Sequence, residues 1–205
     1  MASKGEITRE KILETAEALV LEQGFSGTSI DDIIGGAGLT KGAFFYHFND
    51  KGALARALAH RYWEEDFRRL DDFAARARSL ADDPLQAVFL FFKLFEEFIE
   101  SLEEVPIGCL FASYVYESRQ FDPALNDFIE TGFRNWGRMM EGLFDDAIAA
   151  HPPNAPVTAA ELAEISMSII EGGFILARAY KEAPFLARQS RIFRQLLESL
   201  FAEKT

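Results

Sequence analysis

The sequence has little of the chemistry that builds disulfides, metal centres or membrane spans. Cys109 is its single cysteine, which excludes an internal disulfide, and His47, His60 and His151 lie in three segments without a partner at metal-ligand spacing. No apolar run approaches the roughly 18 residues of a membrane span, and the N-terminus lacks the apolar stretch of a signal peptide. We therefore expect a cytoplasmic protein with no metal and no other cofactor.

Catalytic motifs and positive charge are scarce as well. The sequence has no G-x-S-x-G, Walker or Rossmann glycine pattern, so we do not expect an enzyme. Its 21 Lys and Arg stand against 33 Asp and Glu, a net charge of −12, and residues 1–52 hold five cations against eight acids, a balance of −3. Few cations are available to attract phosphate groups, so any binding of nucleic acid is expected to be weak at random sequence and to depend on a specific site.

Apolar residues recur at helical spacing along the whole chain, which predicts an all-α protein. With 49% hydrophobic residues among 205, the chain is long enough for one small and one larger helical unit. Gly24, Asp83-Pro84 and the Thr158/Glu161 pair are typical of helix ends and starts. The predicted helices cover about residues 8–23, 30–37, 41–48, 51–79, 84–102, 109–118, 123–148, 159–180 and 184–202.

Residues 28–51 are the most informative segment, because they predict two short helices joined by a tight turn. Ser29 and Asp32 have the spacing of a capping box for the first of these helices. Gly38 supplies the turn, and Thr40 is expected to cap the second helix. This pattern is typical of a helix-turn-helix, in which the second helix enters the major groove of DNA.

The same segment resembles the tetracycline-repressor (TetR) family of bacterial transcriptional regulators. The resemblance depends on Glu22-Gln23-Gly24-Phe25, Thr28-Ser29, Ala37-Gly38-Leu39-Thr40-Lys41-Gly42 and Phe44-Phe45-Tyr46-His47-Phe48 before Asp50-Lys51. It implies a three-helix helix-turn-helix DNA-binding domain at residues 1–51, followed by a larger helical ligand-binding and dimerisation domain at residues 52–205. Phe45 departs from the family pattern, which usually has tyrosine there.

The outer side of the second short helix and its flanks supply the candidates for DNA contacts. Phe44 and Phe48, four residues apart, are expected on the inner side. The residues expected to contact base edges or phosphates are Thr28, Ser29, Thr40, Lys41, Gly42, Ala43, Phe45, Tyr46, His47 and Lys51. The alternatives are helix capping or packing for His47 and a solvated charge for Lys51.

The last two predicted helices carry long apolar stripes. The resemblance implies that they form a homodimer as a four-helix bundle, and the dimer would place its two DNA-reading helices on an inverted-repeat operator. The interface candidates are Ile165, Ile169, Gly172, Gly173, Leu176, Ile192, Phe193, Leu196, Leu197 and Leu200. The alternative is that these residues serve only the core of their own subunit.

The aromatic content after residue 51 is high enough to enclose an apolar pocket. The pocket candidates are Phe92, Phe95, Cys109, Tyr114, Phe133, Trp136, Met140 and Arg178, and further polar candidates are Tyr116, Glu117, Arg119, Asn135, Arg138 and Glu171. Plain core packing is the alternative for each apolar residue. Cys109 begins a predicted helix, so a thiolate sensor and a small buried hydrophobe are both open interpretations.

Taken together, these features predict a ligand-responsive transcriptional regulator. The resemblance implies a repressor that binds an operator as a dimer and is released by a small apolar or aromatic inducer. The alternative is a dimeric helical protein that binds a small molecule or a partner but has no specific operator.

Overall fold

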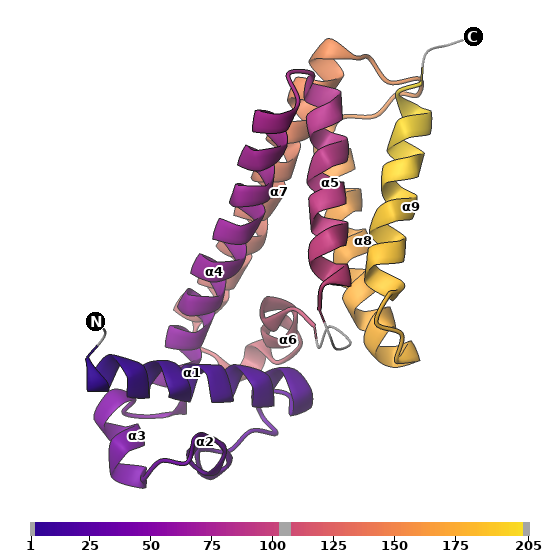
Figure 1. Cartoon of the computed structure of the whole chain (residues 1–205). Coiled ribbons are helices and arrows are strands. Elements are labelled where there is room, and N and C mark those ends of the chain that lie inside the picture. Colours follow the sequence, from indigo (N-terminus) through magenta and orange to yellow (C-terminus); the bar gives the residue numbers. More distant parts are fainter. Residues whose placement is uncertain (1–2, 103–107, 203–205) are drawn as a thin grey trace. The chain divides into compact units, whose positions relative to one another are not determined.

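The computed structural model describes residues 3–102 and 108–202, which are helical almost throughout (Figure 1). In chain order the elements are α1 (Lys4–Gln23), α2 (Ile30–Ala37), α3 (Lys41–His47), α4 (Lys51–Leu80), α5 (Pro84–Glu100), α6 (Leu110–Tyr116), the 3-10 helix η1 (Ser118–Gln120), α7 (Pro123–Ala150), α8 (Ala159–Tyr180) and α9 (Phe185–Leu200). The all-α prediction is confirmed. Within the described ranges, no helix is long and apolar enough to span a bilayer.

Several helices begin directly after a side-chain cap, at the residues that the sequence indicated. At α2 the Ser29 hydroxyl accepts a hydrogen bond from the Asp32 N–H at 3.1 Å, and the Asp32 carboxylate accepts one from the Ser29 N–H at 2.9 Å. At α5 the Asp83 carboxylate accepts from the Gln86 N–H at 2.9 Å, directly before Pro84. These caps pair backbone donors that a helix cannot satisfy in its own first turn.

The start of α1 differs from its prediction. The helix begins at Lys4 rather than near Thr8, because Ser3 and Glu6 form a further capping box in which the Ser3 N–H donates to the Glu6 carboxylate at 2.6 Å. The bonds from Ser3 also lower the pKa of Glu6 below its ordinary value. The extra turn lengthens the helix on which α2 and α3 pack.

The segment between α5 and α7 also differs from its prediction. The predicted helix over 109–118 is a shorter α6, which is followed by η1 as a separate element. Gly108 precedes α6 with a φ of 138°, a backbone angle that favours glycine. The predicted interruption at Pro106-Ile107 lies outside the described residues.

The chain divides into two compact units, and α4 and α7 contribute residues to both. The first unit comprises Met1–Glu65 and Cys109–Thr131, and the second comprises Asp66–Gly108 and Gly132–Thr205. In the first unit α1 contacts α2, α3 and α6. This unit therefore combines the helix-turn-helix with α6, a segment that is remote from it in the sequence.

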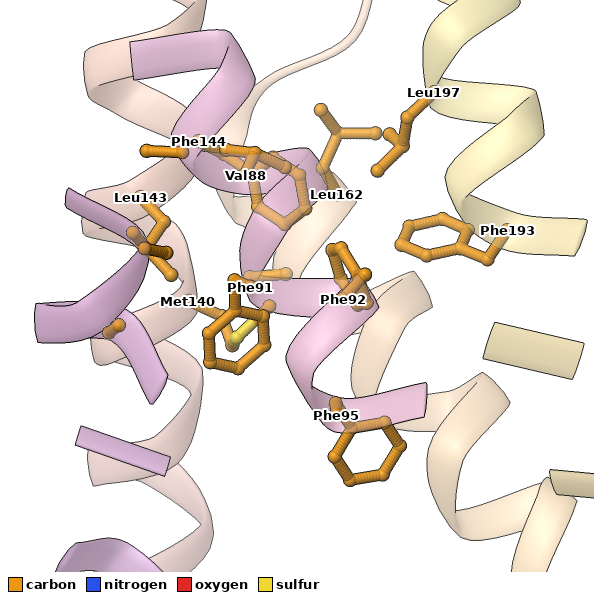
Figure 2. Packing of buried hydrophobic residues seen from close by; sticks show 14 of the residues in the cluster. Val88, Phe91, Phe92, Phe95, Met140, Leu143, Phe144, Leu162, Phe193 and Leu197 are labelled. Carbon is orange, nitrogen blue, oxygen red and sulfur yellow. The ribbon is translucent and has the colours of Figure 1, made fainter. Parts of the chain in front are cut away.

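The second unit is built around an aromatic core, in which α9 contacts both α5 and α8. Figure 2 shows Phe91, Phe92 and Phe95 of α5 pointing into this core, with Met140 of α7 and Phe193 of α9. The ring centroids of Phe92 and Phe193 are 5.2 Å apart in an edge-on arrangement. Aromatic side chains of this size make burial of apolar area the main source of stability in this unit.

One charged side chain is fully buried beside this core. Glu96 of α5 has no exposed surface, and its carboxylate accepts hydrogen bonds from Arg194 of α9 at 3.0 and 3.3 Å. Arg191 lies 3.7 Å from the same carboxylate. A buried carboxylate needs such partners, because an unpaired charge in an apolar interior is strongly unfavourable. The ion pair therefore fixes α9 against α5.

Candidate nucleic-acid interface

The geometry of the turn between α2 and α3 matches the sequence prediction. Gly38 adopts a left-handed conformation with a φ of 62°, and its N–H bonds the last carbonyls of α2. Thr40 then caps α3 by accepting a hydrogen bond from the Ala43 N–H at 3.2 Å. The two short helices of the helix-turn-helix are thus each fixed at the end that faces the turn.

The inner side of α3 is fully buried. Phe44 has no exposed surface and Phe48, the C-cap residue, is 3% exposed. Their ring centroids lie 5.9 Å apart, and Phe45 packs edge-on against Phe44 at 5.3 Å. Since two phenylalanines anchor a helix of one to two turns, its opposite side is held toward solvent.

That opposite side brings together several of the predicted DNA-contacting residues. The Lys41 side chain is 71% exposed, and Phe45 and Tyr46 are 40% and 82% exposed. A Cβ added at Gly42 would meet nothing within 4 Å. Thr40 is exposed at the start of the helix, and its capping bond leaves the hydroxyl proton for another acceptor. These side chains can therefore meet base edges and phosphates.

Ala43 and His47 are half-buried on the flanks of α3. Ala43 donates its N–H to the Thr40 cap. The His47 ring packs edge-on against Tyr46, with centroids 4.9 Å apart, and lies near Gly5 of α1. Such packing orients the imidazole beside the exposed tyrosine.

Three predicted phosphate contacts have partners within the protein. Thr28 is fully buried, and its hydroxyl donates to the Gly24 carbonyl at 2.8 Å. The Ser29 hydroxyl donates to the Asp32 carboxylate at 2.6 Å. Lys51 donates to a backbone carbonyl of the α1–α2 turn. In the free protein these three side chains stabilise the turn and the α2 cap.

The charged residues near α3 include Lys41 and the two acids of the first turn of α2. The Lys41 ammonium lies 4.0 Å from the Asp31 carboxylate, but both side chains are more than two-thirds exposed, so the pair contributes little to stability. Asp31 and Asp32 place two acids in the first turn of α2. The hydrogen bonds from Ser29 lower the pKa of Asp32, which keeps that carboxylate charged. Attraction to phosphate must therefore come from few cations and from neutral donors.

The pocket candidates are dispersed over both units. Phe92, Phe95, Trp136 and Met140 fill the core of the second unit. Tyr114 belongs to the first unit, where it is fully buried and donates to the Ala55 carbonyl at 3.4 Å; burial raises the pKa of its hydroxyl. Cys109 is half-buried before α6 and makes no capping bond, and Arg178 is exposed on α8.

Phe133 lines a groove between α7 and α8 of the second unit, with a volume of about 460 Å³. The groove is also lined by the uncharged residues Gly137, Ala160, Ala163 and Met167 and by the charged residues Arg134, Arg138, Glu141 and Glu164. Phe133 also packs against the core that contains Phe92, Phe95, Trp136 and Met140, so it lies between the groove and this core.

The dimer candidates divide into two groups. Phe193 and Leu197 are buried in the core of their own subunit, and Leu200 packs against that core. Gly173 is buried too, and a Cβ there would lie 2.5 Å from Leu186, so this glycine serves the contact between α8 and α9. The exposed or half-buried candidates are Ile165, Ile169, Gly172, Leu176, Ile192 and Leu196.

These six residues, which we call the α8–α9 face, are an apolar surface on the last two helices. The sequence prediction did not include Ile175 and Tyr180, which are also exposed on α8. Ile175 lies within the range of the predicted stripe but off its helical spacing, and Tyr180 lies beyond Leu176, the last residue of the stripe, so periodicity did not select them.

The described residues do not bring three or more His, Cys, Asp or Glu side chains together in a group that could hold a metal ion. The described residues form a capped helix-turn-helix in which the outer side of α3 is exposed. This arrangement defines a DNA-binding regulator. The profile of bacterial regulatory proteins of the tetR family matches residues 12–58, and that of the tetracyclin repressor-like C-terminal domain matches residues 84–193. The chain belongs to the TetR family of transcriptional regulators.

Individual relatives agree with this assignment. The HTH-type transcriptional regulator LmrA of Bacillus subtilis is 27% identical over 195 residues, which cover 93% of this chain and 97% of LmrA. The HTH-type transcriptional repressor NemR of Escherichia coli is 34% identical over 65 residues, 32% of this chain and 33% of NemR. The fold is similar to that of a TetR-family regulator from Agrobacterium tumefaciens, with a TM-score of 0.80 at 22% identity over 97% of this chain and 100% of the other.

Proposed function

We propose that this chain is a ligand-responsive repressor that binds an inverted-repeat operator as a homodimer and is released by a small apolar or aromatic inducer. The observation that carries the proposal is the exposure of Phe45 and Tyr46 on α3, a helix whose Phe44 is fully buried. Large side chains held outward on a capped helix are suited to a DNA groove. The name of NemR, a repressor that is similar to 32% of this chain, supports repression.

The first turn of α3 supplies the proposed base contacts. Lys41 donates to guanine, and Thr40, Gly42 and Ala43 bring the backbone close to the base edges. Phe45 packs on a thymine methyl group or a sugar. Phosphate contacts come from Tyr46 and His47, and Ser29 and Lys51 join them if they exchange their present bonds for bonds to DNA. Thr28 supports the turn from the inside.

Dimerisation is proposed through the α8–α9 face. Ile165, Ile192 and Leu196 are 46%, 43% and 60% exposed, which is unusual for residues of this size at helical spacing. A second copy that covers this face would bury these side chains and relate the two α3 helices by a two-fold axis. The two helices would then enter successive major grooves about 34–36 Å apart.

Release requires a second state with lower affinity for the operator. The helix α4 begins directly after the helix-turn-helix and continues into the second unit, so a shift of this helix can move α3. A ligand that favours the low-affinity state by about 3 kcal/mol would weaken operator binding by roughly two orders of magnitude. Aromatic compounds should therefore weaken operator binding in the order of their preference for the low-affinity state over the operator-binding state.

Selection of bound fragments from random DNA, followed by footprinting, tests the reading helix. We expect an inverted repeat that is protected on one face of the duplex. Lys41→Ala and Tyr46→Ala should each weaken binding about tenfold or more in the dimer, and Lys41→Ala should also relax base choice at one position per half-site.

Two matched variants serve as controls for those substitutions. Lys93→Ala removes a lysine of α5 whose side chain is 45% exposed, and Tyr116→Ala removes a tyrosine that is 76% exposed on α6. Both should retain wild-type affinity. A protein that enriches no DNA motif, or one whose affinity survives both α3 substitutions, would refute this part of the proposal.

Light scattering of an Ile165→Arg/Leu196→Arg double variant tests the dimer. We expect monomers and a loss of operator binding, because two buried arginines would face their symmetry mates without partners. Leu80→Arg is the control, since Leu80 is 61% exposed at the end of α4 and lies outside the α8–α9 face. A double variant that stays dimeric would contradict the proposed interface.

A further inference from the structure

The turn between α1 and α2 is held by a side chain from a remote part of the sequence. The Glu117 carboxylate, at the end of α6, accepts hydrogen bonds from the Phe25 N–H at 2.7 Å and the Ser26 N–H at 2.8 Å. The Ser26 hydroxyl donates to the same carboxylate. One ionised side chain thus satisfies three donors of a single turn, and hydrogen bonds to a charged acceptor are the stronger kind.

The same turn is held from two other directions. The Lys51 ammonium, at the start of α4, donates to the Phe25 carbonyl and lies 4.1 Å from the centroid of the Phe25 ring. The Phe25 ring in turn packs against Phe121 at 4.8 Å and Tyr114 at 5.7 Å. The backbone N–H, the backbone carbonyl and the ring of Phe25 are therefore all fixed by residues outside α1, α2 and α3.

Gly24 shows that the turn is shaped around Glu117. Its φ of 82° is a conformation that side-chain-bearing residues rarely adopt, and a Cβ at this position would lie 2.7 Å from the Glu117 carboxylate oxygen. Glycine is needed here both for the backbone angle and for the close approach of the carboxylate.

The turn leads directly into α2. The Thr28 hydroxyl donates to the Gly24 carbonyl at 2.8 Å, and the Thr28 N–H donates to the Phe25 carbonyl at 3.2 Å. The next residue, Ser29, caps α2, whose far end continues through Gly38 into α3. The direction of α2, and through it that of α3, therefore depends on a turn that Glu117 holds.

We propose that Glu117 is a positioning residue for operator binding, which acts on α2 and α3 through its hydrogen bonds to the turn at Phe25 and Ser26. The inference deepens the operator binding proposed above and depends on it. It replaces the sequence interpretation of Glu117 as a polar group of a ligand pocket, because all three donors to the carboxylate belong to the turn between α1 and α2.

The loss of the Glu117 charge and the loss of its hydrogen bonds should change DNA affinity in opposite directions. Burial raises the pKa of Glu117, but the hydrogen bonds from Ser26 and Phe25 and the charge of Lys51 lower it more, so the group is an anion at neutral pH. Removal of an anion from a chain with a net charge of −12 favours DNA binding by charge alone. A loss of affinity in a neutral variant has the opposite sign and must come from geometry.

The test compares Glu117→Ala, Glu117→Gln and a control in the second unit. Glu161→Ala is the control, because the Glu161 carboxylate also accepts from a backbone N–H and a hydroxyl, both of Thr158, at 2.8 and 2.9 Å. Operator affinity is measured by fluorescence anisotropy at fixed salt on folded protein, and amide hydrogen exchange reports the turn itself.

We expect Glu117→Ala to weaken operator binding about tenfold or more, and Glu117→Gln to weaken it less, because the amide oxygen keeps one acceptor. The slope of affinity against salt should not change, since Glu117 contacts no phosphate in this proposal. The amides of Phe25 and Ser26 should exchange faster in both variants. Glu161→Ala should bind as the wild type does.

The proposal is overturned if Glu117→Gln and Glu117→Ala bind the operator as tightly as the wild type, or if Glu161→Ala weakens binding as much as Glu117→Ala. If Glu117→Ala does not fold, the comparison of Glu117→Gln with the wild type decides. A wild-type protein that selects no DNA motif would refute operator binding itself. Slow exchange of the two amides in the Glu117 variants would refute the role of Glu117 whatever the DNA result.

Discussion

The contacts inside the first unit differ in kind from the contacts inside the second unit. In the first unit, single charged side chains join segments that are far apart in the sequence. Glu117 holds the α1–α2 turn, and Arg61 of α4 donates to Glu10 and Glu17 of α1 at 2.5 Å each. In the second unit a large aromatic core joins the helices, and Glu96 adds one buried ion pair.

The difference follows from the size of the helices. The buried part of α3 is Phe44 alone, and that of α2 is Ile33 and Ala37, so these helices have little apolar area with which to fix their direction. Hydrogen bonds and ion pairs are directional and can supply what packing lacks. The long helices of the second unit bury whole apolar stripes, so packing is the main contact that holds them, and the Glu96–Arg194 ion pair adds to it.

Truncation of the aromatic core of the second unit should have the largest effect on stability. Phe92→Ala removes a 1% exposed ring and should lower the free energy of unfolding by about 3–5 kcal/mol. Urea denaturation at fixed protein concentration measures it. Phe45→Ala is the matched substitution in the first unit, where the ring is 40% exposed; it should cost far less stability but weaken operator binding. Equal losses of stability in both variants would contradict the comparison.

Loss of the buried ion pair should rank second. Glu96→Ala leaves Arg194 with Glu198, at 2.8 Å, as its remaining carboxylate partner, so we expect a loss of about 2 kcal/mol rather than the larger cost of a fully stranded charge. Glu97→Ala removes the neighbouring exposed carboxylate, which pairs with Lys93 at 3.5 Å, and should change stability by about 0.5 kcal/mol or less. If the two variants unfold alike in urea, Glu96 does not fix α9 against α5.

Local signals in the sequence predicted most of the helix starts. Capping spacings at Ser29, Thr40, Asp83 and Thr158 each correspond to a cap in the structure, because a cap involves residues only three apart. The start of α1 was predicted too late, because Ser3 and Glu6 precede the apolar stripe that guided the prediction.

The spacing of residues along the sequence could not predict contacts between residues that are far apart in the chain. Nothing local to Glu117 indicates that it meets Phe25 and Ser26, and the burial of Thr28 depends on the same turn. For the same reason periodicity did not separate Leu196, which is exposed, from Leu197, which is buried in its own subunit. The exposed side of α3 was predictable, because Phe44 and Phe48 assign its inner side.

The ion-pair network of the first unit should have a moderate effect. Arg61 is 16% exposed and also lies 3.3 Å from Glu65, so Arg61→Ala leaves three carboxylates without their shared cation. We expect a loss of about 1–2 kcal/mol that shrinks in high salt, because salt screens the repulsion. Arg56→Ala, which removes an exposed pair with Asp122 at 2.8 Å, should cost less. A loss that is independent of salt would assign the effect of Arg61 to packing.

The smallest expected effect is the pH dependence of Glu117. Its pKa in the folded protein lies below the ordinary value of 4.5, so its contribution to stability is complete above that value and is lost as the pH falls through the folded pKa. The difference in melting temperature between the wild type and Glu117→Gln should therefore be constant near neutral pH and should shrink below about pH 4.5, where the carboxyl group becomes protonated and resembles the amide. Differential scanning calorimetry from pH 7 to pH 4 measures this difference.

Because the carboxylates of Glu6, Asp32 and Asp83 also have lowered pKa values, both proteins should lose stability in acid, and only the difference between them reports on Glu117. A difference that grows in acid would mean that the turn does not bind Glu117 as an anion, and the first unit would then depend on packing as the second does.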